Sequence, residues 1–314
     1  MKISVLVPSH EFSVQQRQRL AKRGSIKYAA SRQEMAVEAI KRTVENANIL
    51  VIDPDLFGGF EKAKDRVTQV AESLPDLRGL ALSTTSYGWI DLEYFKKRQI
   101  PVCNIPGYSR ESVAEHTLAL LLCLAKRIII TDRKTQTGQY KLEMGFELKD
   151  KTLGIIGLGN IGSRVAELAQ GIGMKVIAYN RSPRKKPGVK MVSLNQLLRQ
   201  SDAITLHVID SEATKNMINK KALDKMKPGA IIVNTVGRET VNEADMAQAI
   251  KSGKVYGYAY EAEDLEHTPL AKLENAVGIK GFGWYTKEAL ERLTLIWVDN
   301  ILAIAKGKPQ NVIL

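Results

Sequence analysis

Short apolar runs alternate with polar, helix-like stretches along the first hundred residues of the chain. The runs that have the length of strands cover residues 3–7, 49–52, 80–82 and 101–104. Between the first two runs, residues 13–22 have the polar composition of a surface helix. Strands that are separated by helices predict a parallel sheet with helices packed on it.

The same alternation continues in the second part of the chain. Residues 112–130 predict one long, largely buried helix with Ser109 or Ser112 as N-cap, and Glu115 is placed to complete a capping box with Ser112. Further strands are predicted at 152–156, 176–179, 203–207, 230–234 and 255–258, and further helices at 161–171, 194–200, 220–225, 243–251 and 287–305. The pattern predicts a second parallel α/β domain.

Composition narrows the class of protein. The chain has 314 residues, of which 44% are hydrophobic and 25% charged, as is ordinary for a globular protein. No apolar run reaches the roughly 18–20 residues of a membrane span, and the N-terminal run is too short for a secretory signal, so we expect a cytoplasmic protein without membrane contact. Cys103 and Cys123 have no redox or metal spacing, and the four histidines form no ligand pair, so we expect no metal site.

The net charge of +12 is compatible with an anionic ligand, a nucleic acid or a generally cationic surface. Basic residues are spread along the chain, with small runs at 96–98 and 184–186. Neither an aromatic-interleaved basic motif nor a helix-turn-helix pattern accompanies them. We therefore expect a cationic surface and no specific nucleic-acid partner.

A glycine-rich turn carries the clearest chemical signal. Gly157, Gly159 and Gly162 follow the predicted strand 152–156 and open the predicted helix 161–171. In a dinucleotide-binding turn the first glycine allows the tight bend, the second lets the backbone approach a pyrophosphate, and the third lets helix and strand pack closely. Asn160 and Ile161 lie at the start of the helix, where backbone N–H groups bind phosphate. We predict that these five residues bind a dinucleotide; the alternative is a purely structural turn.

The end of the next strand discriminates between NAD and NADP. An acidic residue there would accept a hydrogen bond from the ribose 2′-hydroxyl of NAD. This sequence has Asn180, Arg181 and Ser182 instead, and no carboxylate follows in the loop. Arg181 can stack on adenine and pair with a 2′-phosphate, helped by Ser182 and Arg184. We predict NADP in preference to NAD; the alternative is a basic surface loop.

Several further motifs stand in an order that resembles the D-isomer-specific 2-hydroxyacid dehydrogenase family. These segments are residues 100–109, 113–117, 157–162, 201–208 and 225–235. The resemblance implies two Rossmann-like domains with parallel sheets: a flavodoxin-like substrate domain formed by residues 1–102 and 286–314, and a dinucleotide-binding domain at 103–285. It also implies cofactor contacts from His207 and Thr235, a small-molecule substrate and a homodimer formed through the helix at 112–130.

The catalytic residues that the resemblance implies are an Arg that binds the substrate, a His that acts as general acid and base, and a Glu that raises the pKa of the His. Gly237 occupies the Arg position, with Arg238 one residue later. Gly281 occupies the His position. The Glu position falls on Glu266 in an acidic loop, which is equally compatible with a solvated surface.

Our candidates for catalysis are therefore Glu266, Arg238, His267 and Tyr285, and Lys280 and Tyr260 are further possible proton donors. Aromatic residues also replace the small residues expected near the substrate: Tyr87 and Trp89 in the loop at 83–91, and Phe282, Trp284 and Tyr285 after the Gly281 position.

Two hypotheses follow from a preserved nucleotide half and an altered substrate half. The first is an NADP(H)-dependent oxidoreductase with a rebuilt active site that acts on a bulkier carbonyl, an imine or an activated alkene. The second is a catalytically inactive NADP(H)-binding sensor or scaffold.

Overall fold

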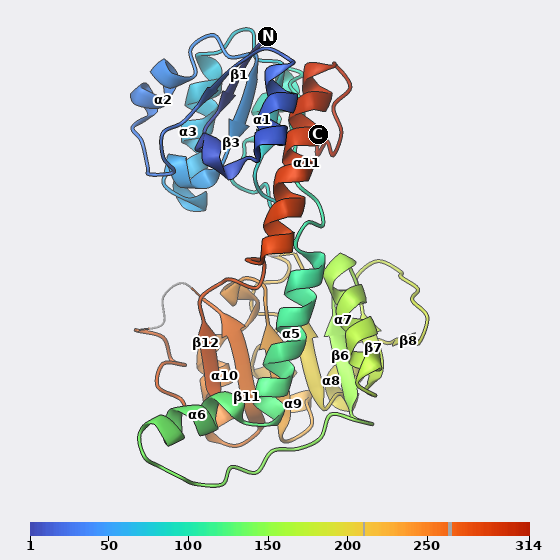
Figure 1. Cartoon of the computed structure of the whole chain (residues 1–314). Coiled ribbons are helices and arrows are strands. Elements are labelled where there is room, and N and C mark those ends of the chain that lie inside the picture. The colour runs from blue at the N-terminus through green and yellow to red at the C-terminus, as the bar shows by residue number, and fades with distance from the viewer. Residues whose placement is uncertain (210, 263–265) are drawn as a thin grey trace. The chain divides into compact units, whose positions relative to one another are not determined.

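The computed structural model describes residues 1–209, 211–262 and 266–314. The chain forms two compact units, Met1–Tyr108 with Lys287–Leu314 and Ser109–Thr286. The first unit extends beyond the predicted boundary at residue 102 because the short strand that ends at Cys103 pairs with its sheet. In this unit the strands are β1 (Lys2–Val5), β2 (Ser25–Tyr28), β3 (Ile49–Ile52), β4 (Gly79–Leu82) and β5 (Val102–Cys103), and the helices are α1 (Val14–Ala21), α2 (Val37–Thr43), α3 (Phe60–Glu72), α4 (Leu92–Lys97) and α11 (Lys287–Ala305) (Figure 1).

The first unit is a five-stranded parallel sheet in the order β2-β1-β3-β4-β5, which is the order of flavodoxin-like folds. All four residues of β3 are buried, because helices cover both faces of the sheet. Leu50 and Ile52 belong to the core beneath α2, α3 and α4, whereas Ile49 and Val51 belong to the core shared with α1 and α11. The indole N–H of Trp297 in α11 donates to the carbonyl of Ala81 at 3.2 Å, which fixes the C-terminal helix to this sheet.

The second unit contains a seven-stranded sheet in the order β12-β11-β10-β9-β6-β7-β8, and every pairing in it is parallel. Its strands are β6 (Thr152–Ile156), β7 (Lys175–Tyr179), β8 (Val189–Met191), β9 (Ala203–Leu206), β10 (Ala230–Asn234), β11 (Val255–Glu261) and β12 (Ala276–Ile279). Its helices are α5 (Arg110–Ala125), α6 (Ile128–Gln136), α7 (Asn160–Gly171), α8 (Leu194–Gln200), α9 (Lys220–Lys225) and α10 (Glu243–Lys251). The order reverses between β6 and β9, so the carboxyl ends of these two strands form the switch point where α/β folds bind ligands.

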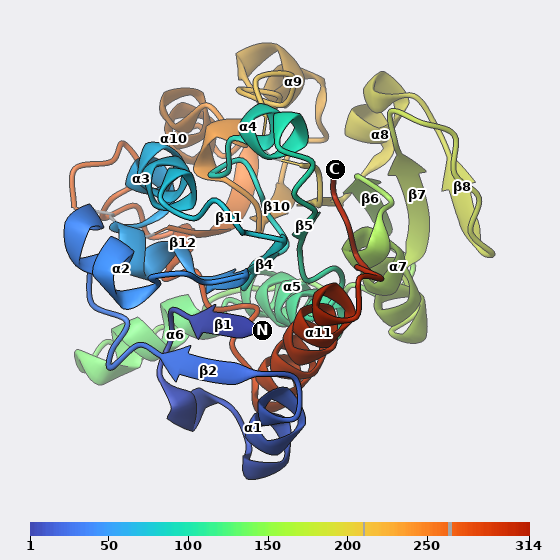
Figure 2. The same cartoon turned by 90° about the horizontal axis from the view of Figure 1, so that it is seen from above.

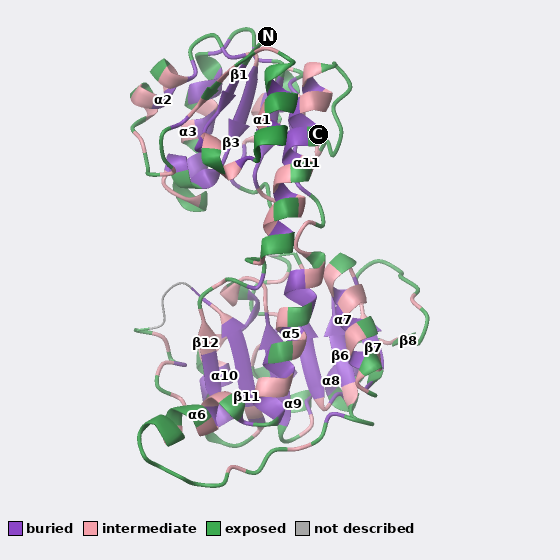
Figure 3. Cartoon of the chain, in the orientation of Figure 1, coloured by how far each residue is buried: buried purple, intermediate pink, exposed green. Residues whose placement is uncertain are grey.

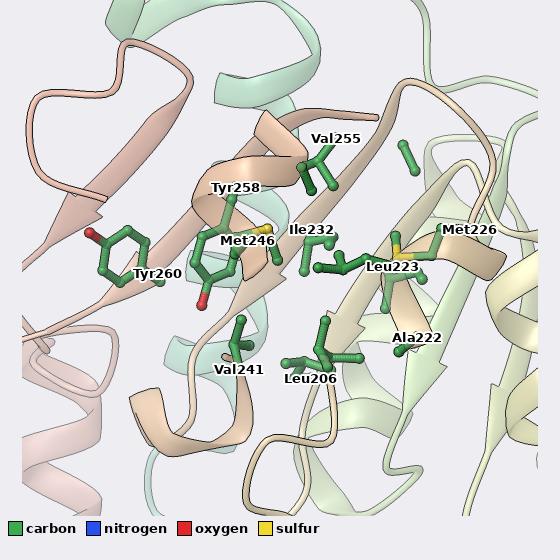
Figure 4. Close-up of a cluster of buried hydrophobic side chains, with 14 of the residues drawn as sticks. Leu206, Ala222, Leu223, Met226, Ile232, Val241, Met246, Val255, Tyr258 and Tyr260 are labelled. Atoms are coloured by element: carbon green, nitrogen blue, oxygen red, sulfur yellow. The ribbon is translucent and has the colours of Figure 1, made fainter. Parts of the chain in front are cut away.

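Helices cover both faces of this sheet, with α5 and α7 on one side and α8, α9 and α10 on the other (Figure 2). The central strands are therefore buried on both faces, while the helices are exposed on their outer sides (Figure 3). Leu206, Ile232 and Met246 meet in the core on the α10 side, beside the stacked rings of Tyr258 and Tyr260 (Figure 4). The predicted fold class, two α/β units with parallel sheets, is confirmed.

The single long helix predicted at 112–130 was wrong, because Arg127 divides it into α5 and α6. Arg127 has φ +54°, a left-handed conformation that ends a helix. Its buried guanidinium makes an ion pair with Glu143 at 3.0 Å and lies 5.1 Å from the ring centroid of Tyr256. The predicted capping box was also wrong: Ser109 is the N-cap without a side-chain bond, and Ser112 lies inside the helix and donates elsewhere.

Among the described residues, no helix is long and apolar enough to cross a membrane. Within the same part of the chain, no group of three or more His, Cys, Asp or Glu side chains is placed to hold a metal ion.

Candidate active site

The turn between β6 and α7 is closed by backbone contacts. Gly157 has φ +99°, and its N–H donates to the carbonyl of Tyr179 at 2.9 Å. A Cβ on Gly157 would lie 2.5 Å from the carbonyl oxygen of His207, and a Cβ on Gly162 would lie 2.1 Å from the carbonyl oxygen of Gly157. Both positions therefore require glycine, since any side chain would displace backbone.

Gly159 differs from these two glycines because no atom lies within 4 Å of the position that its Cβ would take. It directly precedes α7, whose first residues, Asn160 and Ile161, have N–H groups without partners inside the helix. Such N–H groups and the helix dipole favour a phosphate. The residues of the turn thus fit the diphosphate of a dinucleotide.

His207 follows β9, which is the neighbour of β6, and the residue as a whole is half-buried. Its Nε2 atom is shielded from solvent and has no hydrogen-bond partner among the described residues. Burial lowers the pKa of the imidazole to about 3, so the ring is neutral at physiological pH. Thr235, the other predicted contact, follows β10 and is half-buried. An unpaired ring nitrogen at the switch point supports the fit of a cofactor there.

The residues after β7 connect the glycine turn to the loop that was predicted to read the 2′ position. The Oδ1 atom of Asn180 accepts from the N–H of Leu158 at 3.0 Å, and its Nδ2 atom donates to the carbonyl of Ser182 at 2.7 Å. Asn180 therefore orders the turn through its side chain. Arg181 and Ser182 are exposed in the loop.

A carboxylate on α7 is neutralised by the same loop. Glu167 accepts from Lys186 at 2.6 Å and from Arg164 at 2.8 Å. The hydrogen bond from Lys186 and then that from Arg164 lower the pKa of Glu167 to about 2. Lys186 is thus occupied, while Arg181 and Arg184 extend into solvent.

The segment after β10 carries Arg238, the residue next to the Gly237 position. Arg238 lies in a 3-10 turn, Arg238–Thr240, and its Nε atom donates to Glu243 at 2.7 Å. Asn234 is fully buried at the end of β10, and its Oδ1 atom accepts from the N–H of Val236 at 3.0 Å. The guanidinium of Arg238 is therefore held at the start of α10.

The other three predicted catalytic side chains lie in two different settings. Glu266 and His267 are exposed, and Glu266 lines a groove of 640 Å³ between α6 and residues 270–274. Residues 263–265 of the same acidic loop lie outside the described residues. Tyr285 is exposed after β12, with its ring edge-to-face against Trp284 at 5.2 Å.

In the first unit, the loop at 83–91 carries two large aromatic residues, of which Trp89 is buried and Tyr87 is exposed. Trp89 is buried against Phe60, and its indole N–H donates to the hydroxyl of Thr84 at 3.1 Å. Tyr87 is 42% exposed. Trp89 therefore exposes little of its ring, and Tyr87 is the more exposed of the two aromatic side chains.

A group of side chains that the sequence did not point to surrounds Gly283. Glu261 at the end of β11 accepts from the N–H of Gly283 at 2.7 Å, and the hydroxyl of Ser112 donates to its carbonyl at 2.5 Å. The Nε2 atom of His116 lies 3.4 Å from Glu261. His116 lies in the segment 113–117 that carries part of the family resemblance, but no local pattern links it to residues 261 or 283.

Comparison with known proteins agrees with this geometry. The family model described as the NAD-binding domain of D-isomer specific 2-hydroxyacid dehydrogenase matches residues 118–282. A glyoxylate reductase from Thermococcus litoralis is 36% identical over 262 residues, which cover 78% of this chain and 79% of that protein.

Two solved structures share the fold over nearly the whole chain. An acyclic imino acid reductase in complex with NADPH and D-Arg superposes with a TM-score of 0.87 at 29% identity and covers all of both chains. A D-lactate dehydrogenase from Aquifex aeolicus with NAD and lactic acid has a TM-score of 0.79 at 28% identity, covering 98% of this chain and 96% of that one.

Proposed function

This chain belongs to the D-isomer-specific 2-hydroxyacid dehydrogenase family, a family of nicotinamide-dependent oxidoreductases, and from that premise we propose that it is an NADPH-linked reductase of 2-imino acids. The observation that carries the proposal is Gly281, which stands where the family resemblance places the proton-donating His. The rebuilt site and the preference for NADPH are parts of the same proposal.

The chemistry of the two substrate classes explains why a missing proton donor favours an imine. A 2-oxo acid that accepts hydride at carbon becomes an alkoxide, which needs a proton from a positioned acid. A protonated imine that accepts hydride becomes a neutral amine, so the step needs no proton from the protein. Gly281 has no side chain that donates a proton, and this suits the imine.

The residues that would hold the cofactor are those of the switch point. The N–H groups at the start of α7 would bind the diphosphate above Gly159, and His207 and Thr235 would flank the remainder at the ends of β9 and β10. Arg181 and Ser182 would bind the 2′-phosphate. When bound, the nicotinamide supplies the hydride.

The imino acid reductase supports both parts of the proposal, since it is similar over the whole chain and was solved with NADPH and D-Arg. The second candidate is a 2-oxo acid reductase, which the 36% identity with a glyoxylate reductase favours. For either reaction Arg238, Glu266, His267 and Tyr285 remain our candidates for catalysis. Glu266→Gln should lower turnover by about two orders of magnitude or more if Glu266 is an acid, base or orienting group.

The experiment that separates the two candidates is ammonium dependence. NADPH consumption is followed with pyruvate and with phenylpyruvate, in ammonium chloride and in potassium chloride of equal ionic strength, and the product is examined by chiral chromatography. We expect consumption only with ammonium, which forms the imine in solution, and a D-amino acid as product. Equal rates in both salts would establish the 2-oxo acid reductase. Tight NADPH binding without turnover of any substrate would favour the inactive sensor or scaffold.

The homodimer is also part of the proposal, and the apolar outer side of α5 supports it. Leu118, Ala119 and Leu122 retain exposure on this helix. After α6, Tyr140 and Leu142 are 86% and 99% exposed. Apolar surface of this kind is typical of an interface. Sedimentation analysis of the wild type and of Leu122→Glu should give a dimer and a weakened dimer, whereas two monomers would exclude this interface.

A further inference from the structure

The segment after β12 is hydrogen-bonded to two other elements of the second unit through the backbone N–H and C=O of Gly283. Glu261 accepts from the N–H of Gly283 at 2.7 Å, and Ser112 donates to its carbonyl oxygen at 2.5 Å. Glu261 ends β11, and Ser112 lies in the first turns of α5, so two separate elements hold the same residue. Ser112 and Gly283 are both buried, which makes these hydrogen bonds costly to lose.

His116 completes this group from the next turn of α5. Its Nε2 atom is 3.4 Å from the Oε1 atom of Glu261, and the two side chains are only 14% and 15% exposed. The imidazole ring also supports Phe282, with 5.1 Å between the ring centroids. A Cβ on Gly283 would lie 2.8 Å from the Cδ2 atom of His116 and 3.0 Å from Glu261 Oε1, so the three residues fit closely.

The residues on either side of Gly283 present aromatic rings to solvent. Phe282, Trp284 and Tyr285 are 47%, 38% and 62% exposed, and we call these three side chains the aromatic segment. The N–H of Tyr285 donates to the carbonyl of Phe282 at 2.8 Å, which bends the segment into a turn around Gly283. Holding Gly283 therefore determines where all three rings project.

We propose that Glu261 and His116 are positioning residues that hold the aromatic segment against the substrate's side chain and so select substrates with a large side chain. The proposal rests on the proposed function, because the aromatic segment directly follows the Gly281 position, where the family resemblance places the reacting group. Aromatic faces bind flat or cationic groups well and gain little from a methyl group. Large aromatic or guanidinium-bearing side chains are the class of substrate that this surface fits.

The test compares Glu261→Ala, Glu261→Gln and the control Glu45→Gln, which changes an exposed carboxylate in the first unit. The variant with Gln retains an oxygen that can accept from Gly283, whereas the variant with Ala does not. Unfolding curves show first that each variant is folded. Oxidation of D-arginine, D-phenylalanine and D-alanine is then followed with NADP⁺.

We expect Glu261→Ala to lower kcat/KM for D-arginine and D-phenylalanine about tenfold, mainly through KM, because a buried N–H loses its acceptor. D-alanine should change less than about twofold, and Glu261→Gln should restore most of the loss. An equal loss for all three substrates would overturn the proposal, because it would place Glu261 in a general step. The absence of any loss for D-arginine and D-phenylalanine in Glu261→Ala would overturn it as well.

A second readout needs neither substrate nor cofactor. Of the three tryptophans, Trp89 and Trp297 are buried and only Trp284 is substantially exposed, so iodide quenching of tryptophan fluorescence reports chiefly on the aromatic segment. Glu261→Ala and His116→Ala should change this quenching, while Glu45→Gln should not. If the wild type oxidises no D-amino acid, the proposed function fails, and the kinetic comparison is made with phenylpyruvate and glyoxylate instead. Unchanged quenching in both variants would overturn the positioning role in either case.

Discussion

Two turns at the carboxyl edge of the second sheet depend on glycine, and the atoms that require the glycine differ between them. At the turn after β6, a Cβ added at Gly157 or Gly162 would lie 2.5 or 2.1 Å from a backbone carbonyl oxygen. At the segment after β12, a Cβ added at Gly283 would lie 2.8 Å from the side chain of His116 and 3.0 Å from that of Glu261. A backbone carbonyl oxygen is present whichever residue occupies a position, whereas a side chain can be replaced by a smaller one.

This difference determines which substitutions each of the two turns can tolerate. A substitution in the β6 turn has no local compensation, because the clash is with the main chain. A substitution near Gly283 can be compensated by one further change in α5 or β11. The β6 turn is therefore constrained to glycine by main-chain atoms, whereas Gly283 is constrained by side chains that can themselves be replaced.

The largest expected effect is that of Gly157→Ala. The new Cβ clashes with backbone and disfavours the left-handed φ of +99°, so the free energy of unfolding should fall by roughly 2–5 kcal/mol. The matched control is Gly159→Ala, where the Cβ meets no atom. The free energy of unfolding of Gly159→Ala in urea should stay within about 1 kcal/mol of the wild-type value. The variant should nevertheless bind NADPH weakly, because the methyl group would fill the space that we propose for the diphosphate. Equal destabilisation by Gly157→Ala and Gly159→Ala would show that the backbone clash at Gly157 is not what makes glycine necessary there.

The next effect is a pH dependence that comes from His207. Its pKa in the folded chain is about 3, below the value of about 6.5 in an unfolded chain, so the unfolded chain binds the proton more tightly. The stability that comes from the neutral ring is complete above about pH 6.5 and is lost as the pH falls toward 3. In His207→Gln the decrease in unfolding free energy across this window should be smaller by up to about 4 kcal/mol. Parallel pH profiles for the two proteins would show that the ring accepts a proton without opening the fold.

A smaller effect, confined to the cofactor, is expected for Arg181→Ala. Arg181 is exposed, so the fold should be unaffected, but the loss of a charge-assisted bond to the 2′-phosphate should weaken NADPH binding about 10- to 100-fold. NADH binding should change little, and Lys185→Ala, another exposed basic residue of the loop, should change neither. Fluorescence titration of both cofactors measures this. Equal weakening for NADPH and NADH would show that Arg181 does not read the 2′-phosphate.

Local sequence was sufficient where local interactions decide the structure. The strand at 152–156 and the helix at 194–200 have the predicted bounds, and the helix begins with a capping box between Ser193 and Gln196. The break at Arg127 could not be predicted, because its left-handed backbone accompanies contacts with Glu143 and Tyr256. Both residues are distant in the sequence, so the residues next to Arg127 give no sign of these contacts. The side chains around Gly283 were missed for the same reason, since they come from α5, β11 and the segment after β12.

The smallest effect is also the sharpest test of the contrast between the two turns. Gly283→Ala should cost about 1–2 kcal/mol of stability, because the methyl group presses on the ring of His116 and on Glu261. In a His116→Ala background the ring is absent, so the same substitution should cost less, and the double-mutant cycle should give a coupling of at least about 0.5 kcal/mol. Gly157→Ala in the same background should keep its full cost, since its clash is with backbone. If Gly283→Ala cost the same with and without the ring of His116, the segment after β12 would be as rigidly determined as the glycine turn.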